Sequence, residues 1–257
     1  MRSTPVKSIR IDRIPVHIFE SKEELGQRVA DDAATLLSSL VERQGKAAVI
    51  LATGNSQLTF ISALRRLKGV PWDKVTLFHM DEYLGMSDQH AASFARFIRE
   101  NVVDYVHPAA FYPIRGDSSD IKSELDRYRR LLREFSPDIC VMGIGENGHL
   151  AFNDPPADFE STEVIHVLNL DSRCRMQQVG EGHFATFDDV PTRAYSLTIP
   201  ALLDVKYALV AVPELRKAEA VKVALQGPVT PNCPASILRT KPNVTLYLDR
   251  ESASLLQ

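Results

Sequence analysis

Short, unbroken apolar runs recur along this chain, and segments with helical spacing separate them. Runs such as AAVILA (47–52) and DICVMGI (138–144) show no alternation of polar and apolar residues. This pattern is typical of strands that are covered on both faces, as in parallel sheets. Further strand candidates are IPVHIF (14–19), KVTLFHM (74–80), AYSLTI (194–199), YALVAV (207–212) and VTLYLD (244–249).

The intervening segments carry the apolar spacing and the end signals of helices. In the clearest, 21–45, Ser21 and Glu24 form a capping-box pattern and Gly45 ends the apolar face. Strands that alternate with helices imply parallel crossovers. We therefore expect an α/β fold: a single Rossmann-like doubly wound, mostly parallel sheet with helices on both faces, in one domain over 1–257. Residues 155–190 lack clear periodicity, and we expect them to form a lid. The other expected helices span 55–69, 91–106, 119–135 and 213–227.

Composition excludes several classes of function. The net charge of -3 argues against a nucleic-acid partner, because binding phosphate backbones needs a basic surface. No apolar run approaches the roughly 20 residues that span a bilayer. Cys140, Cys174 and Cys233 are an odd number of cysteines without a CxxC pair, which indicates neither a disulfide framework nor a zinc site. We expect a reducing compartment, hence a cytoplasmic protein.

Three loops follow predicted strands and are candidate ligand-binding loops, because ligands bind at the carboxyl ends of parallel strands. The first of them follows the strand 47–52. Gly54 and Asn55 tolerate a positive φ, and Ser56 can cap the next helix. With Thr53 they form a loop whose backbone N–H groups could hold an anion. It matches neither a P-loop nor a dinucleotide fingerprint, and an ordinary strand-to-helix turn is the alternative.

The second loop begins with Asp81 and Glu82, directly after the apolar strand 74–80. Two adjacent acids cannot both point into the core, so we expect one to face a ligand cleft and the other an ion-pair partner. A carboxylate in that place is a natural general base if burial raises its pKa. A solvated turn with a capping aspartate is the alternative. His79, within the strand, is expected to be a packing histidine.

The third loop, GIGENGHLAFNDPP (143–156), follows the strand 138–144. Its glycines give backbone freedom, and the imidazole of His149, with an ordinary pKa of about 6.5, suits proton transfer at neutral pH. Glu146 and Asp154 are close enough in sequence to orient it or tune its pKa. A glycine-rich turn with a packed histidine is the alternative, but glycines, a histidine and acids gathered at a strand end favour a site.

Together, MDEY (80–83) and GIGENGHLAFNDP (143–155) resemble the glucosamine-6-phosphate deaminase family. The TGNS loop (53–56) is similar to that family's Thr-Gly-Gly-Thr-type phosphate loop, and the resemblance runs from about residue 20 to 250. The 6-phosphogluconolactonases of the same superfamily typically have Asp-Glu-Arg and Gly-His-Thr-Ala-Ser at these places. The deaminase pattern fits this chain better at both.

The resemblance implies conversion of glucosamine 6-phosphate and water into fructose 6-phosphate and ammonia, with no metal and no organic cofactor. His149, supported by Asp154, would open the sugar ring, and Asp81 would remove the C2 proton. C1 is then reprotonated and the imine is hydrolysed. The phosphate would be bound by Thr53, Gly54, Asn55, Ser56, Arg173 and Lys217, with Arg175 and Arg216 as the alternatives if the register slips.

Two departures from the family pattern are visible. Asn147 and Asp154 stand where the best-known deaminases have Asp and Glu. Asn147 cannot act as a base, but it can hydrogen-bond a substrate hydroxyl or orient His149. Allosteric members use basic residues just after this loop, and residues 157–170 contain no Arg or Lys. We therefore expect no activation by N-acetylglucosamine 6-phosphate.

Other functions remain open from the sequence. The main rivals are a 6-phosphogluconolactonase and a deaminase for another amino-sugar phosphate, such as galactosamine 6-phosphate. A non-catalytic sugar-phosphate sensor is a further alternative, since Asn147 could mark a degenerate site. The expected partners are a small sugar phosphate and, as one option, further copies of the chain in a homo-oligomer, but neither nucleic acid nor a membrane.

Overall fold

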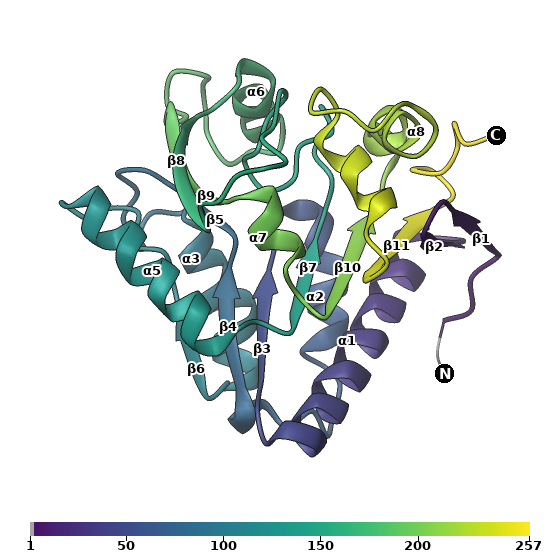
Figure 1. Cartoon of the computed structure of the whole chain (residues 1–257), viewed down its shortest axis with the longest axis horizontal. Helices are drawn as coiled ribbons and strands as arrows, with labels where there is room; N and C mark the ends of the chain where they lie inside the picture. Colours follow the sequence, from purple (N-terminus) through teal and green to yellow (C-terminus); the bar gives the residue numbers. More distant parts are fainter. Residues whose placement is uncertain (1–2) are drawn as a thin grey trace.

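A computed structural model describes residues 3–257 and contains an eight-stranded central sheet (Figure 1). Neighbouring strands are parallel except for β1, which forms an antiparallel hairpin with β2. The predicted mostly parallel sheet is therefore confirmed. In spatial order the strands are β1 (Lys7–Ile11), β2 (Ile14–Phe19), β11 (Val244–Asp249), β10 (Tyr207–Val212), β7 (Ile139–Met142), β3 (Ala47–Leu51), β4 (Val75–His79) and β6 (Ala110–Tyr112).

Helices cover both faces of this sheet, because its strands are apolar on both sides. One apolar cluster joins α1 (Lys22–Gln44), α2 (Leu58–Leu64), the π-helical turn η3 (Arg99–Val103) and their neighbours to one face. The other cluster joins α5 (Ile121–Phe135), α7 (Ile199–Leu203) and α8 (Ala218–Gln226) to the opposite face. The first face also includes α3 (Phe94–Ile98) and α4 (Asp104–Val106).

A second, three-stranded sheet lies at the carboxyl ends of the central strands, and the sequence did not reveal it. It consists of β5 (Asp81–Tyr83), β9 (Arg193–Leu197) and β8 (Ile165–Asn169), all antiparallel. The chain enters it directly from β4, and the N–H of Leu197 donates to the carbonyl of Met80 between them. The segment expected as a lid contributes β8 and the helix α6 (Ser172–Gly180), which sits above the central sheet (Figure 1).

The end signals of α1 act as expected. The Ser21 hydroxyl accepts from the N–H of Glu24, and Gly45 ends the helix with a φ of 78°. The Glu24 carboxylate, however, accepts from the N–H of Glu20 rather than from that of the capping residue. Short 3₁₀ turns begin two of the functional helices: η1 (Asn55–Gln57) precedes α2, and η4 (Leu215–Lys217) precedes α8; the others are η2 (Trp72–Lys74) and η5 (Pro234–Thr240).

Among residues 3–257, the structure has no helix that is long and apolar enough to cross a membrane.

The closest approach between α1 and α2 depends on Gly26. A Cβ added there would lie 2.7 Å from the backbone N of Phe60 and 2.7 Å from the backbone C of Thr59. Real side chains do not tolerate such distances to backbone atoms, so a larger residue would push α2 away.

We predict that Gly26→Ala lowers the free energy of unfolding by about 1 to 3 kcal/mol through overpacking. The sign of this stability change is informative, because replacing Gly by Ala in a helix interior ordinarily stabilises a protein by about 1 kcal/mol. Gly180→Ala is the matched control, because a Cβ on Gly180 would meet no atom within 4 Å. Urea unfolding followed by circular dichroism measures both, and equal stabilisation of both variants would contradict the prediction.

Candidate active site

A pocket opens at the carboxyl ends of β3, β4 and β7, beneath α6. It brings together residues from all three loops that the sequence singled out: 53–57, Asp81, and 143–145 with His149. Lys217, at the end of η4, also lines it. The α6 segment closes one side with Gln177, Gln178 and Glu181.

Asp81 is a buried carboxylate that faces this pocket. Its side chain is nearly inaccessible to solvent, and Oδ1 has no hydrogen-bond partner within the described chain. Burial, and then the neighbouring charge of Glu82, raise the pKa of Asp81 well above its usual range. Asp81 is therefore poised as a general base that is not committed to a structural contact.

Glu82 points the other way and holds a helix start. Its carboxylate accepts from the backbone N–H groups of Phe94 and Ala95 and from the Ser93 hydroxyl, at 2.8 to 3.2 Å. Burial raises the pKa of Glu82 to about 7, although these hydrogen bonds oppose the shift. The expected partner was a cation, and that expectation is wrong: the partner is the amino end of α3. The amino end of a helix suits a carboxylate, because the first backbone N–H groups of the helix have no partner within it.

Tyr83 completes this segment inside a small aromatic cluster. Its ring packs against Phe94, Phe152 and Phe184, and its hydroxyl donates to Gln178 Oε1 at 2.8 Å. Gln178 lines the pocket, so Tyr83 ties α6 to the strand that carries Asp81. His79, by contrast, is a packing residue as expected. Burial lowers its pKa to about 3, and its Nε2 accepts from the N–H of Ile114.

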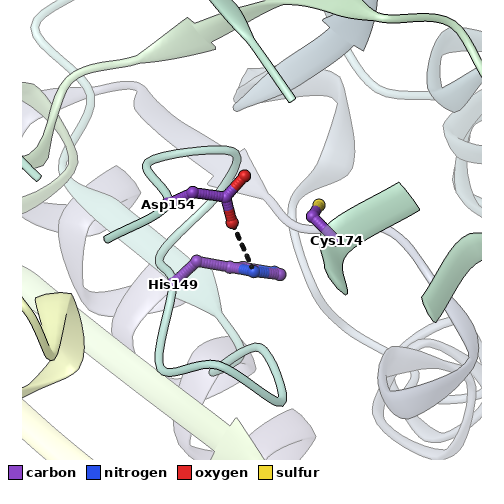
Figure 2. Close-up of side chains that lie close together, drawn as sticks. All are labelled: His149, Asp154 and Cys174. Carbon is purple, nitrogen blue, oxygen red and sulfur yellow. Dashed lines mark ion pairs between the residues drawn. The ribbon is translucent and has the colours of Figure 1, made fainter. Parts of the chain in front are cut away.

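His149 and Asp154 lie side by side, with His149 Nδ1 and Asp154 Oδ1 3.2 Å apart (Figure 2). The contact is at ion-pair distance without the alignment of a good hydrogen bond. Burial favours the neutral form of Asp154, but contacts with His149, Asn147 and the N–H of Asp171 outweigh it and lower its pKa. Asp154 is therefore an ionised support for the imidazole.

Asn147 fastens this pair instead of facing the pocket. Its Nδ2 donates to Asp154 Oδ1 at 2.9 Å, and its Oδ1 accepts from the backbone N–H of His149 at 3.0 Å. An amide is needed for both bonds, because one end donates and the other accepts. The predicted orienting role for Asn147 fits these contacts, and its role toward a substrate hydroxyl does not.

The absence of a side chain at Gly145 leaves room for the imidazole of His149. A Cβ on Gly145 would lie 2.2 Å from Cε1 and Nε2 of His149. The ring thus lies directly against the glycine backbone, and the N–H of Gly145 donates to the carbonyl of His149. The glycines of the loop matter here through close approach, which only a residue without a side chain permits.

Asn153 anchors the same loop to the small sheet. Its Nδ2 donates to the carbonyls of Leu150 and Leu197, each at 2.8 Å, and its Oδ1 lies 3.1 Å from His166 Nε2. The side chain is buried. The Asn153 amide therefore anchors the end of the loop, because both its nitrogen and its oxygen have hydrogen-bond partners.

Lys217 and the TGNS loop form the end of the pocket that suits an anion. Gly54 has a φ of 93°, and Asn55 begins η1 at the carboxyl end of β3. Lys217 is buried and, among residues 3–257, forms no ion pair. Burial and the charge of Arg216 lower the pKa of Lys217 to about 8. An unpaired, buried cation beside a helix start is chemically suited to hold an anion such as a phosphate group.

Arg216 is occupied by carboxylates at the rim. It forms ion pairs with Glu181 at 2.6 Å, Glu214 at 2.8 Å and Glu146 at 3.2 Å, and it donates to the Ser56 hydroxyl. Burial would raise the pKa of Glu181, but its bonds to His183 and Arg216 lower it to about 2. Arg216 therefore ties the end of α6 to both the TGNS loop and the loop that carries His149.

The two lid arginines lie elsewhere. Arg173 is exposed on α6 and lines a neighbouring cavity, not the pocket that holds Asp81 and Lys217. Arg175 donates to the carbonyls of Phe187 and Val190 and stacks on the Phe187 ring. The structure does not bring Arg173 together with the other predicted phosphate ligands, so its role in phosphate binding stays a prediction.

Sequence reasoning missed the glutamines of the pocket. Gln57 Nε2 donates to the carbonyl of Ala211, while its buried Oε1 has no partner within the described chain. Gln177 and Gln178 come from α6. Polar residues at the start of the helix after 55 and in QQVGEG (177–182) were the only sequence signal for these glutamines. Such polar runs are equally common on exposed surfaces, so they did not identify the pocket.

Comparisons with known proteins identify the family of this chain. The model of the family "Glucosamine-6-phosphate isomerases/6-phosphogluconolactonase" matches residues 20–247. The glucosamine-6-phosphate deaminase of Exiguobacterium sibiricum is 37% identical over 240 residues, which cover 93% of this chain and 92% of that protein. The deaminase of Bacillus cytotoxicus is 33% identical over 238 residues, which cover 93% of this chain and 87% of that protein.

Solved structures show the same fold. A monomeric glucosamine-6-phosphate deaminase superposes with a TM-score of 0.85 at 29% identity, covering 93% of this chain and 99% of its own. A 6-phosphogluconolactonase from Shewanella baltica superposes with a TM-score of 0.77 at 19% identity, covering 94% of this chain and 99% of its own. The second likeness shows the fold alone.

We predict that Asn153→Asp lowers the free energy of unfolding by about 2 kcal/mol or more, because a carboxylate would face two carbonyls that have lost their donor. Asn232→Asp is the matched control, since Asn232 is exposed. Urea unfolding at neutral pH measures both variants. Equal stability of the two would mean that Asn153 does not anchor the loop.

Proposed function

Because this chain belongs to the glucosamine-6-phosphate isomerase and 6-phosphogluconolactonase family, we propose that it is a glucosamine-6-phosphate deaminase. Its reaction converts glucosamine 6-phosphate and water into fructose 6-phosphate and ammonia. The observation that carries the proposal is the match to deaminases at 37% and 33% identity over 93% of the chain. The juxtaposition of Asp81 and His149 in one pocket supports the same chemistry.

The substrate phosphate binds at the end of the pocket formed by residues 53–56 and Lys217. The N–H groups at the start of η1 and the lysine ammonium face the anion together. A phosphate dianion there favours the charged form of Lys217, so binding opposes the lowering of its pKa by burial. Arg173 lies outside the pocket and can join only if α6 moves toward the ligand.

Ring opening needs one group that both gives and takes a proton. His149 does this in the proposed mechanism, passing a proton between the anomeric hydroxyl and the ring oxygen. Asp154 stabilises the imidazolium that forms, and Asn147 keeps Asp154 in place. Gly145 lets the ring lie flat against the loop, so the imidazole has one position.

Asp81 then takes the proton from C2. Its uncommitted Oδ1 and its raised pKa suit a base that must receive a proton. The ammonium group on C2 attracts the carboxylate and acidifies the carbon. The proton is returned to C1, and water hydrolyses the resulting imine to release ammonia.

The related deaminase with a TM-score of 0.85 is described as monomeric. This likeness supports a complete site within a single subunit. The expectation of a homo-oligomer stays a prediction, and gel filtration with light scattering measures the oligomeric state.

The test of this function is ammonia release from glucosamine 6-phosphate. We expect activity in the wild type and losses of about 10²-fold to 10⁴-fold in Asp81→Asn and in His149→Gln, the range for removal of a general acid or base. Asp104→Asn and His107→Asn are matched controls at exposed positions in and beside α4. Full activity in Asp81→Asn would remove the proposed base.

The same preparation separates the rival functions. Loss of 6-phosphogluconolactone without ammonia release would indicate a lactonase, and faster ammonia release from galactosamine 6-phosphate would indicate another sugar. No turnover of any of these substrates, with binding retained, would indicate a sensor.

We also predict that Gly145→Ala lowers kcat by about 10²-fold or more, because misplacing a catalytic group by about 1 Å has an effect of that size. The added methyl group must displace the His149 ring. Gly180→Ala, with open space around its Cβ, should keep the wild-type rate. A Gly145→Ala enzyme with normal kcat would show that the ring position is not critical.

A further inference from the structure

Cys174 lies next to the His149–Asp154 pair, and the proposed mechanism does not use it. The sulfur belongs to the first turn of α6, which lies beside the loop that carries the pair (Figure 2). One donor atom from each of His149, Asp154 and Cys174 lies within 4.8 Å of the other two. An imidazole nitrogen, a carboxylate oxygen and a thiol so close together form a set of metal ligands.

The distances suit a small divalent cation. Bonds from Zn²⁺ to nitrogen, oxygen and sulfur of about 2.0 to 2.3 Å place the donor atoms up to about 4 Å apart. Nδ1 of His149 and Oδ1 of Asp154 are already 3.2 Å apart, and the sulfur lies within 4.8 Å of its partner atoms. Nδ1 is buried and has no well-aligned hydrogen bond, which leaves it available as a ligand.

The charge around Asp154 favours a cation. Among residues 3–257, no Lys or Arg forms an ion pair with Asp154; its contacts are Asn147, the N–H of Asp171 and His149. Burial and then the negative charges of Asp154, Asp81, Asp171 and Glu181 raise the pKa of the Cys174 thiol. A divalent ion would therefore meet the Asp154 carboxylate without a competing lysine or arginine.

An ion can approach the cluster from two sides. His149 lines the substrate pocket, while Cys174 and Asn147 line a second cavity of about 470 Å³ on the other side of α6's first turns. The cluster lies between the two cavities. A bound substrate would therefore not close the second route.

We propose that His149 Nδ1, the Asp154 carboxylate and Cys174 Sγ form a binding site for Zn²⁺ that inhibits the enzyme. Three protein ligands leave one position for water, as in open zinc sites. The thiol releases its proton to solvent as the sulfur–zinc bond forms, and no electron is transferred. The bound ion separates His149 from Asp154, so the imidazole can no longer carry protons. Inhibition rests on the proposed function, but binding of the ion does not.

The binding test uses Co²⁺ as a spectroscopic stand-in for Zn²⁺ on the full chain, freed of metal by a chelator. The wild type should bind one Co²⁺ with a thiolate-to-cobalt absorption band, and one equivalent of Zn²⁺ should remove that band. Cys174→Ala and Cys174→Ser should both lack it. Cys233→Ala, which removes another buried thiol near the same loop, should keep it.

The inhibition test measures ammonia release against free Zn²⁺, each variant being compared with its own rate in chelator. Losing one ligand should raise the half-inhibiting Zn²⁺ concentration at least about tenfold in both Cys174 variants, and Cys233→Ala should match the wild type. If the wild type shows no cobalt–thiolate band, the proposal is wrong, and no variant is needed to decide this. The proposal is also wrong if Cys174→Ala and the wild type have the same half-inhibiting Zn²⁺ concentration. A wild type that binds cobalt but releases no ammonia contradicts the proposed function and leaves the site intact.

Discussion

The burial of two adjacent carboxylates, Asp81 and Glu82, is the constraint on which the rest of the site depends. The chain leaves the central sheet at Met80 and enters the small sheet at Asp81, so both acids are enclosed between the two sheets. Isolated charges in such a place cost several kcal/mol. Glu82 is compensated by the N–H groups at the start of α3. Asp81 has no such partner, and this lack of compensation makes it basic.

The loop with His149 solves a second problem, which is to hold one imidazole in one orientation. Three contacts hold the His149 loop and ring. The Asn147 amide bonds to Asp154 and to the His149 backbone, the ionised Asp154 lies beside the ring, and the ring packs against the backbone of Gly145. An acid in place of Asn147 would face Asp154 at hydrogen-bond distance, because Asn147 Nδ2 donates to Asp154 Oδ1 at 2.9 Å. The amide avoids that repulsion.

Much of the fold could be predicted, because strands buried on both faces and amphipathic helices leave clear patterns. The end of α1 at Gly45 and the strand 47–51 follow from such patterns. The small sheet could not be predicted, since β5 has only three residues and its pairing with β9 is entirely non-local. The catalytic pocket was largely predictable from strand ends, because parallel strands carry their loops to one edge. The residues that segment 155–190 contributes to the pocket were not predictable, because Glu181 and Gln178 are placed by tertiary contacts with Arg216 and Tyr83, which no local pattern encodes.

Burial and the charge of Glu82 raise the pKa of Asp81, the proposed base. The pH dependence of kcat/KM for ammonia release tests this role of Asp81 most directly, because that ratio reports groups of the free enzyme. A raised pKa means that the active carboxylate is lost as pH falls through that value, so the acid-side decline should lie well above the usual value of 3.8. In Glu82→Gln the neighbouring charge is gone, and the decline should move to lower pH. An acid-side decline that stays at the same pH in wild type and Glu82→Gln would contradict the account.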